Sequence, residues 1–220
     1  MNKDKYSLNE PTSNYTKLRQ LDNYMTGHKG YIAGGVFKNI FNNENFKDVD
    51  IFFESERDYL EAVELFKKDD KYKSSYKNNK VTAYRNIETG VTVELIKHKF
   101  KSPLDMIDEF DFTITQFVCY KVDVHGEKNE FFGVDEVGYV EWKVAYHKKF
   151  FEHLHMKRLV IDQEMQNIIL PVNTFNRMFR YARYGYFPCR ETKAKIIEAL
   201  RNVPSFSDEM LAMELYNGLD

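Results

Sequence analysis

The stretch YIAGGVFKNIFNNENFKDVDIFFES, residues 31–55, decides the fold that we predict for this chain. Its apolar beginning favours a short strand, and the pair Gly34-Gly35 ends that strand in a turn. VFKNIFNN after the turn has the pattern of a short helix, and DVDIFF has that of a second strand. Aspartate is a poor strand residue, so the fold itself does not require the acids at 48 and 50. Their presence indicates a functional site.

The chemistry of these residues points to a phosphate compound with a bound metal. Asp48 and Asp50 project to one face of the strand because side chains alternate. Two carboxylates so close together repel each other unless a cation lies between them, and Mg²⁺ prefers oxygen ligands. Gly34 and Gly35 let the backbone come close to an anion. The combination suggests a metal-bound nucleoside triphosphate, and the alternative is a tight turn followed by a frayed acidic strand end.

Composition restricts the class of protein. The chain has 220 residues, 43% of them hydrophobic and 30% charged, which is typical of a globular protein with a real core. The net charge of -2 provides no overall basic field for nucleic acid. We see neither a secretory signal nor a run long enough to cross a bilayer, so we expect a cytoplasmic protein that does not bind membranes. Cys119 and Cys189 are predicted to be reduced thiols.

The remaining pattern predicts an α/β head over residues 1–125 and a mainly helical part over 126–220. In the head we expect a helix over 13–25, a helix capped by Ser55 and ending near Lys68, and a short helix capped by Ser102. The lysine-rich segment 67–80 is predicted to be a solvated loop, residues 80–98 a hairpin, and 110–124 a strand. In the second part we expect helices over 140–160, 173–187, 190–203 and 208–216, with Trp142 as a packing residue.

Several segments together resemble a known family. AGGVFKN…KDVDIFF is similar to the head of the DNA polymerase β-like nucleotidyltransferases, in particular the class II tRNA nucleotidyltransferases and bacterial poly(A) polymerases. VTVELIKHKF (91–100) resembles a later strand of that branch, and DEFDFTITQFVCY (108–120) resembles its RRDFTINALAY segment. NRMFRYARYGY (176–186) is similar to its helix with arginines three residues apart, here Arg177, Arg180 and Arg183.

The resemblance implies a nucleotidyltransferase fold, a mixed sheet flanked by helices and followed by a small helical part. It also implies that Asp48 and Asp50 bind two Mg²⁺ ions. An NTP would be the substrate, and a two-metal mechanism would transfer its NMP to a hydroxyl group. The remaining site residues that it implies are Gly34, Gly35, Lys38, Arg177 and Arg180 for the nucleotide, with Glu94 and Asp111 as alternative candidates for the third catalytic acid.

The sequence also departs from that family. Lys38-Asn39 replaces its Arg-Asp, Glu109-Phe110 replaces a pair of arginines, and Asn173-Thr174 replaces an acidic pair. We therefore predict a magnesium-dependent nucleotidyltransferase that is not a CCA-adding enzyme, reminiscent of stand-alone phage or toxin-type transferases. Its acceptor would be an RNA 3′ end (tRNA-like), a protein side chain or a small molecule. The alternatives are a degenerate module that binds a nucleotide or RNA, and an interaction protein whose motifs are coincidental.

Overall fold

The computed structural model describes residues 3–124, 128–129, 134–135, 139–163 and 171–202. These residues form two compact units, one of residues 1–109 with 117–147 and one of residues 110–116 with 148–220. The units therefore do not coincide with the predicted ranges 1–125 and 126–220, because strand β10 (Tyr139–His147) continues the sheet of the first unit. The helix expected over 208–216 lies outside the described residues.

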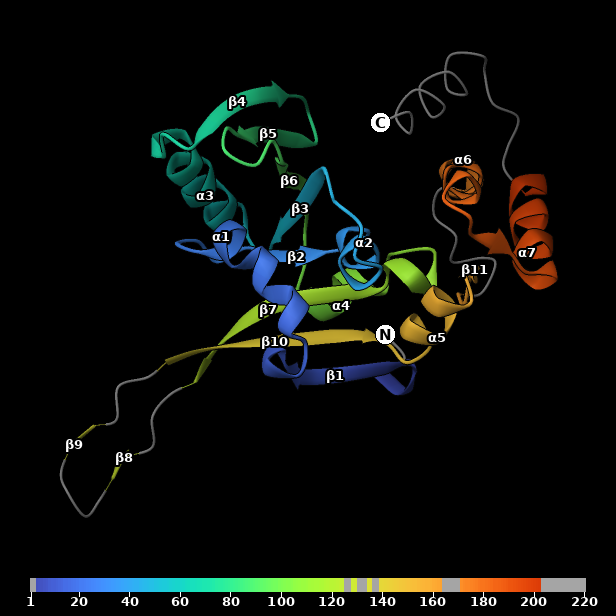
Figure 1. The fold of residues 1–220 in the computed structure, drawn as a ribbon, viewed down its shortest axis with the longest axis horizontal. Coiled ribbons are helices and arrows are strands. Elements are labelled where there is room, and N and C mark those ends of the chain that lie inside the picture. Colours follow the sequence, from blue (N-terminus) through green and yellow to red (C-terminus); the bar gives the residue numbers. More distant parts are fainter. Residues whose placement is uncertain (1–2, 125–127, 130–133, 136–138, 164–170, 203–220) are drawn as a thin grey trace. The chain divides into compact units, whose positions relative to one another are not determined.

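An eight-stranded mixed sheet forms the first unit, in the order β1-β10-β7-β2-β3-β6-β5-β4 (Figure 1). Strands β3 and β6 run parallel, and the other neighbouring pairs run antiparallel. This mixed sheet with flanking helices confirms the predicted fold class. Besides β10, its strands are β1 (Tyr6–Pro11), β2 (Tyr31–Ala33), β3 (Asp48–Phe53), β4 (Tyr72–Lys77), β5 (Val81–Asn86), β6 (Thr92–Phe100) and β7 (Phe117–Val124). A separate pair is formed by β8 (Lys128–Asn129) and β9 (Val134–Asp135).

Short helices connect these strands. They are the 3₁₀ helices η1 (Lys3–Lys5), η2 (Thr12–Asn14) and η3 (Thr16–Leu21), and the α-helices α1 (Asp22–Met25), α2 (Val36–Phe41), α3 (Glu56–Lys68) and α4 (Pro103–Ile107). Two predicted caps are confirmed, since Ser55 accepts from the Asp58 N–H and Ser102 from the Asp105 N–H. Helix α3 packs on the sheet through Tyr59, whose hydroxyl lies 2.8 Å from that of Thr82.

Close packing around Gly30 determines where the first residue of β2 lies. Gly30 precedes that strand, and a Cβ there would lie 2.5 Å from Cγ2 of Ile51 and 2.7 Å from Cε1 of Phe53. Next to it the buried His28 ring accepts from the Gly30 N–H at 3.0 Å and lies 2.9 Å from the Tyr24 carbonyl. The absence of a side chain at residue 30 thus lets β2 lie close against β3.

The second unit contains 3₁₀ helix η4 (Thr113–Thr115) and helices α5 (Phe150–His155), α6 (Pro171–Arg183) and α7 (Arg190–Arg201). Strands β11 (Arg158–Leu159) and β12 (Phe187–Pro188) pair in parallel. Its core is built from fully buried aromatic and aliphatic side chains: Phe112, Phe150, Leu159, Tyr186 and Ile196. Helices α6 and α7 match the predicted helices over 173–187 and 190–203 closely.

Four predicted elements are wrong. Residues 139–147 form β10 instead of a helix, because eight residues of this segment pair with β7. Residues 72–77 form β4 instead of a loop, because β5 offers it a paired edge. The strand expected from residue 110 begins at Phe117, after η4. Most of the helix expected over 13–25 is 3₁₀, and α1 covers only its last four residues.

No helix in the part of the chain that the structure describes combines the length and apolar character that a membrane span needs.

Candidate functional site

Three carboxylates lie on one face of the sheet of the first unit. The parallel register of β3 and β6 pairs Asp48 with Thr92 and Asp50 with Glu94. Paired residues project to the same face, and so do residues two apart on one strand. Asp48, Asp50 and Glu94 therefore share a face, and we call these three side chains the acid row. The structure brings together the two predicted metal ligands and one of the two candidates for the third acid.

The carboxyl group of Asp50 is strongly perturbed. Burial raises its pKa from 3.8 to about 8, and the charges of Glu94 and Asp48 and a hydrogen bond with Glu94 act in the same direction. A carboxyl group in this position holds its proton at neutral pH unless a cation replaces that proton. A cation beside Asp50 would therefore favour the charged form of this carboxyl group.

A tyrosine that the sequence did not suggest extends this row. The antiparallel register pairs Tyr76 of β4 with Ala83 of β5, and Ala83 with Glu94 of β6, so all three share the face of the acid row. The Tyr76 hydroxyl donates to Oε1 of Glu94 at 2.5 Å. The sequence alone predicts a solvated loop for this segment. A bulge between Ser74 and Tyr76 breaks the alternation of side chains along β4, so no local pattern indicates that Tyr76 lies on this face.

The predicted glycine turn lies at the same edge of the sheet as the acids. Strand β2 runs antiparallel to β3, with Ile32 opposite Ile51, so the end of β2 is beside the start of β3. Gly34 has φ +94°, a conformation that favours glycine, and its N–H donates to the Phe117 carbonyl at 3.0 Å. Gly35 is the residue before α2. The glycine turn, the start of α2 and the two aspartates of β3 are therefore close together in the structure as well as in the sequence.

Lys38, the predicted phosphate contact, has a different environment from the one that we expected. It is 5% exposed, and its Nζ lies 3.2 Å from the carboxylate of Glu44. A lysine in this state has its charge partly neutralised by its own chain. A role in nucleotide binding stays a prediction that requires the pair to open.

The acid row has the donor atoms that a metal ion needs, but its side chains are not arranged as a metal site. Among the described residues, no group of three or more His, Cys, Asp or Glu side chains is already arranged to hold a metal ion. The acid row nevertheless offers only oxygen donors, the set that Mg²⁺ prefers. Burial and the charges of Glu94 and Asp48 raise the pKa of Asp50, which marks a place where a cation would relieve repulsion. The residues fit magnesium in chemistry, and binding requires a change of their rotamers.

Asp111, the other candidate for the third acid, belongs to the second unit together with the two predicted arginines. Its carboxylate Oδ2 lies 2.8 Å from Nη2 of Arg177, and Oδ1 accepts from the Phe112 N–H. Asp111 is 5% exposed. Burial and the Asp111 charge raise the pKa of Tyr181, which follows Arg180 on α6. Asp111 and Arg177 are thus each other's partners, and Arg180 lies further along the same helix.

Comparison with solved structures gives the fold a family context. A CCA-adding enzyme in complex with CTP matches with a TM-score of 0.63 at 14% identity, over 97% of this chain and 50% of that one. The Thermotoga maritima CCA-adding enzyme complexed with tRNA matches with a TM-score of 0.55 at 12% identity, over 89% and 46%. A tRNA nucleotidyltransferase complexed with a primer tRNA and an ATP analogue gives 0.51 at 16%, over 84% and 50%.

These matches establish that the chain has a nucleotidyltransferase fold and that it spans about half the length of those enzymes. No curated protein sequence matches it. A family model described as "Gad2: Gabija anti-defense 2 family protein" matches residues 6–157.

Proposed function

The chain belongs to the Gabija anti-defense 2 family, and on that premise we propose that it is a metal-dependent nucleotidyltransferase. It transfers an NMP from an NTP to a hydroxyl group of an acceptor, and this transfer is its contribution to anti-defense. The acid row carries the proposal. Three carboxylates lie together on adjacent strands, where Glu94 and Asp48 add to the effect of burial in raising the pKa of Asp50, beside a glycine turn and in a fold shared with nucleotidyltransferases.

Each residue of the site has a role in this reaction. Asp48 and Asp50, with Glu94, would hold Mg²⁺. When bound, the metal neutralises phosphate charge and lowers the pKa of the attacking hydroxyl. Tyr76 fixes the orientation of Glu94 through its hydrogen bond. The bond between the acceptor oxygen and the α-phosphorus forms while the bond from that phosphorus to the bridging oxygen breaks. Pyrophosphate leaves, and the acceptor proton passes to solvent.

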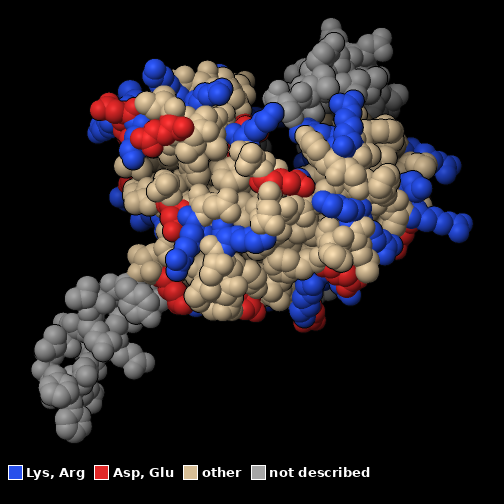
Figure 2. Space-filling view, viewed as in Figure 1, with Lys and Arg blue, Asp and Glu red and all other residues tan. Residues whose placement is uncertain are grey.

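The basic side chains of α6 and α7 favour a polyanionic acceptor such as RNA. Residues 171–202 contain seven Lys and Arg against two Asp and Glu, although residues 110–116 and 148–220 as a whole are nearly balanced, with 11 Lys and Arg against 10 Asp and Glu. Figure 2 shows many of these basic side chains over α6 and α7. Arginines on a helix surface bind phosphate groups through paired N–H donors. RNA is therefore the acceptor that we test first.

One observation favours a second candidate, a module that binds a nucleotide without transferring it. Lys38 is paired with Glu44 at 3.2 Å instead of being exposed to a ligand. A site without an available cation at this position binds triphosphate more weakly and stabilises the leaving group less. Binding with no turnover is the expected behaviour of such a module.

The decisive experiment incubates the protein with each α-labelled NTP, Mg²⁺ and either total cellular RNA or a cell lysate. The matched control is the Asp48→Asn/Asp50→Asn variant. Label transferred by the wild type alone supports the enzyme, and its migration with RNA, protein or small molecules identifies the acceptor class. Metal-dependent NTP binding without transfer supports the binding module, and neither binding nor transfer refutes both.

A further inference from the structure

A cavity lies on the opposite face of the sheet from the acid row. In the register, Cys119 of β7 pairs with Ile32 of β2, and Ile32 pairs with Ile51 of β3. Ile51 projects away from the face of Asp50, its neighbour in the strand. Val144 of β10 pairs with Cys119 of β7, and Trp142 lies two residues before Val144. Trp142 therefore projects to the same face as Cys119. The thickness of the sheet therefore separates the two sites.

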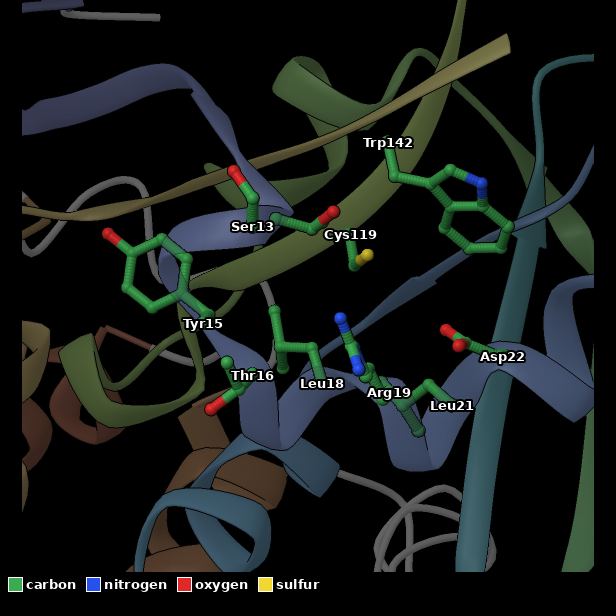
Figure 3. Close-up of a pocket in the computed structure, with 10 residues that line it drawn as sticks. Ser13, Tyr15, Thr16, Leu18, Arg19, Leu21, Asp22, Cys119 and Trp142 are labelled. Atoms are coloured by element: carbon green, nitrogen blue, oxygen red, sulfur yellow. The ribbon is translucent and has the colours of Figure 1, made fainter.

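The cavity has a volume of about 280 Å³, is lined by η2, η3 and the start of α1 above β7 and β10, and opens to solvent, since Arg19 and Asp22 are exposed. Pockets for drug-sized ligands measure roughly 300–1,000 Å³. The cavity is therefore near the lower end of this range, a size suited to a mononucleotide rather than to a larger ligand. Its lining combines apolar and polar groups, among them Ser13, Thr16, Arg19, Asp22, Cys119 and Trp142 (Figure 3).

Trp142 provides an aromatic wall whose position is fixed. It is the only tryptophan of the chain, and it is half-buried at the cavity instead of packed fully into a core. The Lys121 ammonium group lies 5.2 Å from the centre of its ring. Lys121 is itself held by the backbone carbonyls of Met25 and His28. An aromatic ring restrained in this way is a suitable stacking surface for a planar ligand.

Two opposite charges line the same cavity without a partner. Neither Arg19 nor Asp22 makes a side-chain hydrogen bond or ion pair with any residue that the structure describes. Figure 3 shows the Arg19 guanidinium pointing toward the Cys119 thiol. The Asp22 carboxylate lies on the side of Arg19 that faces Trp142, and Ser13 lies on the opposite side of Arg19. Burial raises the pKa of Cys119 to about 12, so this thiol stays neutral and acts as an apolar floor.

We propose that this cavity binds a nucleoside monophosphate whose base carries an amino group. The base stacks on Trp142 and its amino group donates to Asp22, while the phosphate accepts from the Arg19 guanidinium. The proposal rests on the complementarity of a ring, an anion and an amino donor to these side chains. It does not depend on catalysis at the acid row.

The nucleotides CMP and UMP form a matched pair of probes. They differ in one exocyclic group, an amino donor in CMP and a carbonyl acceptor in UMP. Asp22 can accept from the first and repels the second, and a hydrogen bond to a charged group is worth about 1.5 kcal/mol or more. We therefore expect CMP to bind about tenfold more tightly than UMP, since 1.4 kcal/mol corresponds to a factor of ten.

Trp142 reports binding directly, because no other tryptophan contributes to the fluorescence. Saturable quenching by CMP, with the same dissociation constant by calorimetry, is the expected result. Arg19→Gln weakens CMP and UMP alike by about tenfold, and Asp22→Asn brings their affinities together. Both residues are exposed, so far-ultraviolet circular dichroism should show that both variants fold.

Four results would overturn the proposal. They are the absence of saturable binding of CMP by both methods, equal affinities for CMP and UMP, binding of free phenylalanine as tight as that of CMP, and loss of CMP binding in the Asp48→Asn/Asp50→Asn variant. The last result would place the ligand on the other face of the sheet. Retention of CMP binding in that variant, combined with loss of nucleotidyl transfer, separates this site from the proposed function.

Discussion

Replacing Asp50 by asparagine should stabilise the metal-free protein while removing its activity. Burial, the charges of Glu94 and Asp48, and a hydrogen bond with Glu94 raise the pKa of Asp50 to about 8. The folded chain therefore retains a proton that the unfolded chain releases. The stability associated with this carboxyl group is complete below pH 3.8 and is lost as the pH rises to about 8. An asparagine has no charge to lose, and its amide can donate to Glu94 as the protonated carboxyl group does.

The expected change in the free energy of unfolding follows from the pKa shift of Asp50. The pKa rises from 3.8 to about 8, and each of these roughly four units is worth about 1.4 kcal/mol. If the whole pKa shift acts at pH 8, it lowers the free energy of unfolding by about 5 kcal/mol relative to low pH. Asp50 forms a hydrogen-bonded pair with Glu94, so the shift belongs to the pair rather than to Asp50 alone, and replacing Asp50 recovers only part of it. We expect Asp50→Asn to raise the free energy of unfolding at pH 8 by about 2 to 5 kcal/mol, and to leave it nearly unchanged at pH 4.

Urea denaturation of the wild type and the variant from pH 4 to pH 8, with chelator present, measures this difference. Asp70→Asn, at an exposed position, is the matched control and should give a flat difference. Addition of Mg²⁺ at 100 times its dissociation constant should stabilise the wild type by about 2.7 kcal/mol, and the variant by much less. A variant no more stable than the wild type at pH 8 would refute the reasoning, because the acid row would then be compensated within the folded chain.

Three further predictions concern other parts of the structure. Burial lowers the pKa of His28 from 6.5 to about 4, so the unfolded chain binds a proton that the folded chain does not. As the pH falls from 6.5 to 4, the free energy of unfolding of the wild type should therefore fall by about 3 kcal/mol relative to that of His28→Gln, because the contribution of Asp50 is common to both proteins. Tyr76→Phe removes the hydrogen bond to Glu94 and should weaken Mg²⁺ binding, measured by calorimetry, by about tenfold without reducing stability by more than about 1 kcal/mol. Arg177→Met leaves the buried Asp111 carboxylate without its cation and should destabilise the protein by about 3 kcal/mol, whereas the double variant with Asp111→Asn recovers part of that loss in a denaturation cycle.

The local part of the site could be predicted from the sequence. Alternation along a strand places Asp48 and Asp50 on one face, and the glycines mark the turn before them. The choice between Glu94 and Asp111 could not be made, because it depends on which strand lies beside β3. The register of β3 and β6 joins residues more than forty positions apart, and no local pattern encodes that pairing. The catalytic roles themselves stay predictions.

The wrong secondary-structure predictions have the same origin. Tyr76 lies in a lysine-rich segment, which local polarity assigns to solvent, and only pairing with β5 makes it a strand. Trp142 lies in a segment whose apolar residues alternate from Val140 to Tyr146, and the helical pattern that follows from Phe150 obscures this strand signal; pairing with β7 settles the assignment. Both residues matter for the sites proposed above. Tertiary pairing therefore determined the parts of the site that sequence reasoning missed.

A comparison within the first unit argues that the acid row serves a ligand rather than the fold. Glu109 is also a partly buried carboxylate, and burial alone would raise its pKa. Hydrogen bonds from Lys101 and Lys99, the latter at 2.5 Å, lower that pKa below its usual value. The chain thus neutralises a structural carboxylate with its own cations. For Asp50 burial, the neighbouring charges and the hydrogen bond all raise the pKa. An ionised Asp50 weakens the folded state unless a cation binds beside it, and a neutral residue at position 50 would be more stable in a protein that binds no ligand there.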